Sequence, residues 1–149
     1  MINDAQSQSE LWAEIRKIIV HSVRLHDSPL PVIIGIGGAG CMGKTTFAQE
    51  IVSWFSTNEG VLFDLDGYLK DASLRDAEGL TAYDPQAYDL EDAEGSLISL
   101  LTSDNTHLRW YNVFTRKIQS VAVPKCSQIG VIVIEGQQAN LPYFRPSVM

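Results

Sequence analysis

A short glycine-rich segment limits the possible folds of this chain more than any other feature of its sequence. Residues 38–45 read Gly-Ala-Gly-Cys-Met-Gly-Lys-Thr and fit the pattern G-x-x-x-x-G-K-[ST]. The segment follows the apolar run Pro31 to Ile36, which is typical of a strand buried on both faces. A helical pattern of apolar residues follows it, from Lys44 to about Ser56. The order predicts a buried strand, a phosphate-binding loop and a helix.

The physical chemistry of such a loop explains its fixed positions. Glycine tolerates positive φ, so the loop can turn successive N–H groups inward, and the helix N-terminus adds partial positive charge. We expect Lys44 to reach the β- and γ-phosphates, the Thr45 hydroxyl to bind Mg²⁺, and Thr46 to contact the α-phosphate. A glycine-rich turn with a chance Lys-Thr pair is the alternative, which the flanking strand and helix disfavour. The predicted ligand is Mg-ATP, bound by Gly38, Ala39, Gly40, Cys41, Met42, Gly43, Lys44, Thr45 and Thr46.

Two carboxylates follow further apolar runs. Asp66 comes after residues 61–65 (VLFDL), and Glu135 comes after residues 129–134 (IGVIVI). In an open α/β sheet, ligands bind beyond the carboxyl ends of the strands, so both acids should face the phosphates. One suits a general base and the other metal coordination, whereas a solvated strand end is the alternative for each. Asp64 lies within its strand, and we expect a structural role for it.

The remaining segments complete an α/β pattern. A helix is expected from Ser9, as its N-cap, to Leu25, and another from Pro85 to Leu101. Residues 67–85 are polar and predict a long loop. The β-branched and aromatic residues between 109 and 123 predict a hairpin that turns near 115–117. This order of elements indicates an α/β fold with a mostly parallel sheet, of the three-layer type that carries such phosphate loops.

Composition excludes several classes of function. The 149 residues suit a single domain, with an N-terminal helix in 1–28 and a core in 29–149. A net charge of −7 disfavours nucleic acid and anionic membranes as partners. The N-terminus does not resemble a secretory signal, no run reaches the roughly 20 apolar residues of a membrane span, and the two cysteines have no metal-site spacing. We expect a cytoplasmic protein.

Five segments together resemble a known family. IGIGGAGCMGKTTFA, LFDLDGYLKD, YDPQAYDLEDA, YNVFTRK and VIVIEGQQA occur in an order similar to that of the uridine kinase, pantothenate kinase and phosphoribulokinase group of P-loop kinases. The resemblance runs from about Val32 to Ala139. It implies ATP-dependent phosphorylation of a hydroxyl on a small metabolite, with Asp66 as the catalytic base, Lys44 as a catalytic cation, and Thr45 and Glu135 at the metal.

The resemblance also implies residues that bind the acceptor. Tyr68 and Tyr111 match aromatics of the acceptor pocket, although both could be ordinary half-buried side chains. Asp84 matches an acid that binds ribose hydroxyls in uridine kinases, and it could instead cap a helix. Arg116 stands where uridine kinases carry a histidine, so it could be a solvated charge or favour an anionic acceptor such as pantothenate or a sugar phosphate.

The sequence departs from the family pattern at its C-terminal end. Kinases of this group add two further core strands and a lid with arginines after the strand that carries Glu135. The fold is therefore expected to be incomplete at this end, with an open sheet edge that could pair with another copy. A nucleotide-binding module without efficient catalysis is the main alternative to an active kinase.

Overall fold

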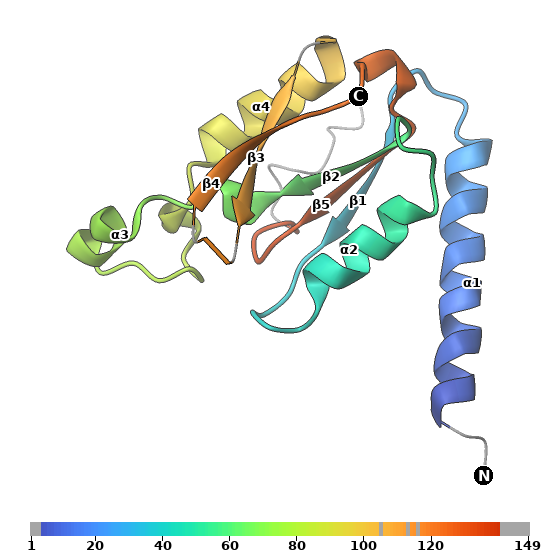
Figure 1. Ribbon diagram of the computed structural model, residues 1–149, viewed down its shortest axis with the longest axis horizontal. Helices are drawn as coiled ribbons and strands as arrows, with labels where there is room; N and C mark the ends of the chain where they lie inside the picture. Colours follow the sequence, from blue (N-terminus) through green and yellow to red (C-terminus); the bar gives the residue numbers. More distant parts are fainter. Residues whose placement is uncertain (1–3, 105, 113, 116, 141–149) are drawn as a thin grey trace.

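The computed structural model describes residues 4–104, 106–112, 114–115 and 117–140. The long helix α1 (Asp4–Leu25) is followed by β1 (Val32–Ile36), α2 (Lys44–Ser53) and β2 (Gly60–Asp64). Then come the short helix α3 (Ala72–Glu78), helix α4 (Leu90–Thr102), the strands β3 (His107–Asn112) and β4 (Lys117–Ala122), and β5 (Val131–Glu135). Three 3-10 turns, η1 (Leu65–Tyr68), η2 (Pro85–Ala87) and η3 (Cys126–Gln128), connect them (Figure 1).

The central sheet is parallel, with strand order β1-β5-β2. Ile36 of β1 and Asp64 of β2 both pair with Glu135 of β5, so the three strands end level. The last strand in sequence is therefore the middle strand in space. This register brings the residues that follow all three strands to one edge of the sheet.

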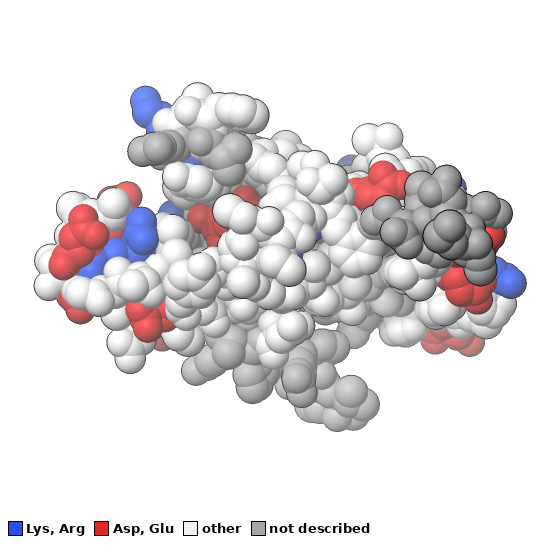
Figure 2. Space-filling model, turned by 90° about the horizontal axis from the view of Figure 1, so that it is seen from below, with Lys and Arg blue, Asp and Glu red and all other residues white. Residues whose placement is uncertain are grey.

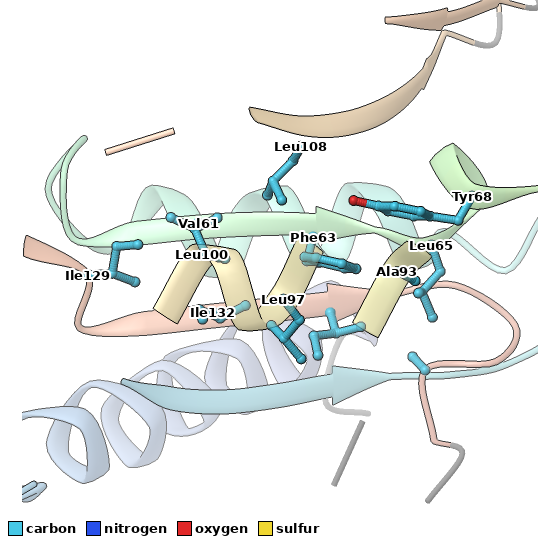
Figure 3. Close-up of a cluster of buried hydrophobic side chains, with 12 residues drawn as sticks. Val61, Phe63, Leu65, Tyr68, Ala93, Leu97, Leu100, Leu108, Ile129 and Ile132 are labelled. Carbon is cyan, nitrogen blue, oxygen red and sulfur yellow. The ribbon is translucent and has the colours of Figure 1, made fainter. Parts of the chain in front are cut away.

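Helices cover both faces of this sheet, which makes the predicted three layers. Alternate residues of β5 point to opposite faces, as the pleat requires. Ile132 and Ile134 pack with α4, whereas Val131 and Val133 pack with α2 and with Val23 of α1. Figure 3 shows the α4 side of this core. Every residue of β5 is buried, which explains its continuous apolar sequence.

The predicted hairpin is present as the antiparallel pair β3–β4, lying on the α4 side of the sheet (Figure 1). Its turn is fixed by Asn112, whose side-chain oxygen accepts hydrogen bonds from the backbone N–H groups of Phe114 and Thr115 (3.0 Å each). An Asn side chain that satisfies the next amides is a common turn device. The turn therefore begins at Asn112, three residues before the predicted turn region 115–117.

Three boundary predictions were wrong. Helix α1 begins at Asp4, so Ser9 lies inside it and does not cap it. Residues 67–85 are not one loop, because they contain the turn η1 and α3. Pro85 opens only the turn η2, and α4 begins after Asp89, whose carboxylate accepts a hydrogen bond from the N–H of Asp92 (3.2 Å). An N-cap bond of this kind starts a helix more effectively than the preceding proline.

The sheet has an edge strand on each side. The edge strand β2 is flanked by the hairpin, whereas β1 pairs only with β5 within the described residues. Pairing of two copies through β1 stays a prediction. None of the described helices is long and apolar enough to cross a bilayer.

Candidate active site

The glycine-rich loop connects β1 to α2, as the motif requires. Cys41 and Gly43 adopt left-handed backbone conformations, with φ of 60° and 77°. No side chain caps the N-terminus of α2 at Gly43, so its first N–H groups point into the loop without a side-chain partner. Such amides form a ready site for an anion. The Lys44 ammonium donates to the Ala39 carbonyl (2.8 Å), which holds it against the loop.

The predicted metal pair forms a direct contact. The Thr45 hydroxyl, in the first turn of α2, donates to Glu135 Oε1 at the end of β5 (2.7 Å). The two residues are ninety positions apart in sequence. Burial raises the pKa of Glu135, and the hydrogen bond from Thr45 opposes that rise. These hard oxygen donors suit Mg²⁺. No group of three or more His, Cys, Asp or Glu residues that could hold a metal occurs in the described ranges.

Asp64 is a buried acid that holds the site together. Its carboxylate accepts hydrogen bonds from the backbone N–H of Asp66 (2.9 Å) and of Tyr111 on the hairpin (3.0 Å). Burial, with a further contribution from the neighbouring Asp66 and Glu135 charges, raises its pKa to about 7. Both carboxylate oxygens are thus occupied by backbone amides. These contacts fit the structural role expected for Asp64 and connect β2 to the hairpin.

The Asp66 carboxylate is held by weaker contacts than that of Asp64. Its strongest side-chain contact is a long hydrogen bond from the Tyr88 hydroxyl (3.4 Å), which also donates to the Ala82 carbonyl (3.0 Å). Burial, together with the Asp66 charge, raises the pKa of Tyr88, so this phenol stays a donor. Among the three acids at the strand ends, Asp66 therefore has the least committed carboxylate. Sequence reasoning missed Tyr88, although it lies inside the quoted segment YDPQAYDLEDA.

These acids line one cavity of about 240 Å³. The hairpin contributes Tyr111 to the lining of this cavity, and a role of Tyr111 in binding the acceptor stays a prediction. The cavity is also lined by Asn112, Phe114 and Gln49, which were not predicted. A polar or aromatic side chain alone does not mark a residue as part of a binding site. The complete lining is Thr45, Gln49, Asp64, Asp66, Trp110, Tyr111, Asn112, Phe114 and Glu135.

Gly67 explains how the hairpin can lie so close to Asp66. A Cβ at this position would be only 2.4 Å from the carbonyl oxygen and 2.6 Å from the carbonyl carbon of Arg109. Real side chains do not approach backbone atoms so closely, so only glycine fits. The glycine of the D-G-Y segment is therefore needed for close packing of two backbones.

Two of the predicted acceptor residues, Tyr68 and Asp84, do not line this cavity. The Tyr68 ring is fully buried in the core, stacked on Phe63 with centroids 5.4 Å apart (Figure 3). The turn η1 directs it inward, so we no longer assign it to the acceptor. Asp84 accepts hydrogen bonds from the Thr81 N–H and hydroxyl (2.8 Å each). These bonds lower the pKa of Asp84 and fix a local turn. Arg116 lies outside the described residues.

Comparison with known proteins agrees with this geometry. The family model "Phosphoribulokinase / Uridine kinase family" matches residues 33–141. A uridine kinase of Halalkalibacterium halodurans is 37% identical over 112 residues, which cover 71% of this chain and 51% of that protein. A pantothenate kinase of Shouchella clausii is 29% identical over 147 residues, covering 80% and 43%. The chain thus spans about half the length of these curated relatives.

A solved structure shows the same fold. It is described as a possible uridine kinase from Bacillus stearothermophilus and superposes with a TM-score of 0.70. The match has 19% identity and covers 91% of this chain and 76% of that one. At this identity the likeness concerns the fold alone, which is the predicted three-layer α/β fold of P-loop kinases. With the family match over residues 33–141, it follows that the chain belongs to the phosphoribulokinase and uridine kinase family.

Proposed function

We propose that this site transfers the γ-phosphoryl group of ATP to a hydroxyl of a small metabolite, as expected for a uridine kinase-like enzyme. The observation that carries the proposal is the 2.7 Å hydrogen bond between Thr45 and Glu135. It joins the phosphate-binding helix to the strand-end acid at the wall of a cavity that also contains Asp66. A purely structural glycine turn would need neither the buried acid nor the adjoining cavity.

In this mechanism each residue of the site has a separate role. The loop amides and Lys44 would hold the phosphates, and Thr45 and Glu135 would hold Mg²⁺, which would neutralise phosphate charge. The acceptor hydroxyl oxygen forms a bond to the γ-phosphorus while the bond from that phosphorus to the β-bridging oxygen breaks. Asp66 takes the hydroxyl proton. The products are ADP and a phosphate ester.

The assignment of Asp66 as base rests on its surroundings. Asp64 is committed to two backbone amides and Glu135 to Thr45, whereas Asp66 has only the long contact from Tyr88. Tyr88 orients the carboxylate without neutralising it. Tyr111, on the hairpin wall, is the residue we propose to contact the acceptor.

ADP release measured with a coupled assay tests the proposal. The acceptors are uridine, cytidine, pantothenate and ribulose 5-phosphate, with a reaction that contains no acceptor as the control. We expect turnover only with an acceptor, and about 10²- to 10⁴-fold slower turnover in Asp66→Asn, because a positioned base contributes that much. The affinity for Mg-ATP should be unchanged in this variant.

Three other results would contradict the proposal in different ways. Tight Mg-ATP binding without turnover of any acceptor would favour the alternative function, a nucleotide-binding module. Turnover that needs no acceptor would indicate a hydrolytic nucleotide switch. Weakened Mg-ATP binding in Asp66→Asn would show that this acid serves the nucleotide instead of the acceptor.

A further inference from the structure

A second cavity adjoins the acceptor cavity and has a different chemical character. It has a volume of about 660 Å³ and lies between the segment that leads into α3 and the hairpin. Tyr111 lines both cavities, so they meet at this residue. A molecule with its hydroxyl near Asp66 could therefore extend past Tyr111 into this second space. The lining residues are Leu69, Lys70, Asp71, Ala72, Arg75, Tyr111, Lys117 and Ile118.

Positive charge dominates this lining. Lys70, Arg75 and Lys117 contribute three cations against the one carboxylate of Asp71. The whole chain has only 11 Lys and Arg residues and a net charge of −7. Figure 2 shows basic side chains beside acidic ones at the end of the molecule that carries α3. These cations are therefore concentrated in one cavity of a protein whose net charge is negative.

The Arg75 guanidinium is held by a contact with the backbone, and the backbone of Lys70 is itself fixed by a hydrogen bond. The Arg75 Nε donates to the Lys70 carbonyl (3.0 Å), which leaves the other guanidinium nitrogens for a ligand. The Lys70 N–H donates to the Ala87 carbonyl (2.9 Å), and both side chains are half-buried. Within the described part of the chain, none of the three cations forms a salt bridge. The charges are thus not explained by internal ion pairs.

Lys117 supplies the third charge from the opposite wall. It is the first residue of β4 and pairs with Asn112 of β3, one residue beyond Tyr111. Its side chain is exposed, and it has no part in the proposed transfer of phosphate. An Arg fork on one wall and a Lys on the other is an arrangement that suits a tetrahedral or planar anion.

We propose that the acceptor is an anionic metabolite whose phosphate ester or carboxylate group binds Lys70, Arg75 and Lys117 while its hydroxyl faces Asp66. The inference rests on the proposed kinase function and makes it more specific. The uncharged remainder of the acceptor would pass the ring of Tyr111. A neutral nucleoside would leave these three cations without an anionic partner, so the same cavity favours a charged acceptor over it.

The first experiment measures anion binding without turnover. The full-length chain is saturated with Mg²⁺ and a non-hydrolysable ATP analogue, so that the phosphate loop is occupied. Inorganic phosphate and, separately, acetate are then titrated while backbone amide resonances are followed by NMR. We expect saturable shifts at residues 70–75 and 117–118, and the stronger of the two ions identifies the class of anion.

Charge-neutral variants give this titration its control. Lys117→Gln and Arg75→Gln should each weaken the binding of the preferred ion at least about threefold, and the double variant about tenfold. Lys125→Gln, which removes a charge from an exposed residue outside the cavity, should change nothing. The absence of saturable shifts there, or equal binding by the double variant, would overturn the anion site.

The second experiment compares acceptors that differ only in charge. Pantothenate is paired with its neutral alcohol, and ribulose 5-phosphate with ribulose, in the ADP-release assay. We expect the charged member of the productive pair to have a KM lower by about tenfold, and Lys117→Gln to reduce that preference. Equal KM values for both members would overturn the proposal for the substrate.

Failure of the kinase function can be told apart from failure of this inference. If the ATP analogue does not bind in calorimetry, the proposed kinase function fails. The phosphate titration is then repeated on Lys44→Ala, in which the loop has lost its cation. Shifts that persist at residues 70–75 and depend on Lys117 would still support the anion cavity, and their loss would reject it.

Discussion

The two sides of the catalytic cavity are built in different ways. The nucleotide side is one continuous segment, from the end of β1 through the glycine-rich loop into α2. The acceptor side is assembled from η1, α3 and the hairpin, which are held together by the contacts of Asp64 and the close packing at Gly67. The first side needs local backbone geometry, whereas the second needs distant segments to be placed correctly.

This difference predicts different sensitivities to mutation. A substitution in the loop should remove ligand affinity without unfolding the protein, because the loop is exposed and makes few tertiary contacts. A substitution where η1 meets the hairpin should weaken stability and acceptor binding together. It should leave the nucleotide side intact, because β1 and α2 do not contribute to that junction.

The largest effect is expected for Lys44→Ala. The ammonium is the cation of the phosphate loop and donates a hydrogen bond to the exposed Ala39 carbonyl. We expect Mg-ATP affinity to fall about 100-fold, since charge-assisted contacts are the strong ones. The free energy of unfolding should change by less than about 0.5 kcal/mol. Calorimetry and urea unfolding measure the two quantities; unchanged affinity would remove the basis for the nucleotide site.

Gly67→Ala should have the opposite profile. The added Cβ would collide with the Arg109 backbone, so the hairpin must move away from η1. We expect a loss of about 1–3 kcal/mol in stability, as in other overpacked sites, and a KM for the acceptor raised at least about tenfold. Mg-ATP affinity should stay within about twofold. Gly95→Ala is the control, because it lies in α4 with open space around its Cβ position.

The same contrast explains what the sequence could predict. The phosphate loop, the three parallel strands and the acids at the ends of β2 and β5 were readable, because a local pattern determines each of them. The burial of β1 on both faces was predicted wrongly, since this edge strand is only partly buried. Helix α3 was missed because none of its residues is buried, so it has no amphipathic signal. The inward direction of Tyr68 depends on the turn η1 and on Phe63, which no spacing in the sequence reveals.

Some missed features did have a signal. Asp89 stands three residues before Asp92, a spacing that predicts the N-cap of α4 more directly than Pro85 does. Asn112 precedes the hairpin turn that its side chain stabilises. In contrast, the cation cavity joins residues 70–75 to residue 117, and only the tertiary fold brings them together.

The pH dependence of stability tests the buried acid that connects the two sides. The pKa of Asp64 is about 7 in the folded protein, against an ordinary value of 3.8. Between these values the folded state keeps a proton that the unfolded state has released. The free energy of unfolding should therefore decrease as pH rises from about 4 to 7, and this contribution should be flat above that range.

The measurement compares the wild-type chain with Asp64→Asn in urea without metal. Each curve gives the free energy of unfolding against pH, and subtracting one from the other removes the contributions of the other titrating groups. These include Glu135, whose pKa is also raised. The difference should change by about 1 kcal/mol per pH unit near pH 5–6, since one pKa unit corresponds to 1.36 kcal/mol. A difference that is constant with pH would show that Asp64 has an ordinary pKa, and a difference that increases with pH would show that its pKa is lowered.

The smallest effect concerns the outer support of the hairpin, where Arg109 bridges β3 and α4. Its guanidinium donates to Asp92 (2.6 Å) and lies 5.2 Å from the centre of the Tyr68 ring. Both charged side chains are more than one third exposed, so solvent screens the pair. A double-mutant cycle of Arg109→Met and Asp92→Asn should give a coupling of about 0.5 kcal/mol.

Arg109→Met should reduce the free energy of unfolding more than Asp92→Asn does, because only the former also removes the contact with the Tyr68 ring. Equal costs would show that the ring contact contributes nothing. A coupling of several kcal/mol would mean that surface charge, and not the close packing at Gly67, holds the acceptor side in place.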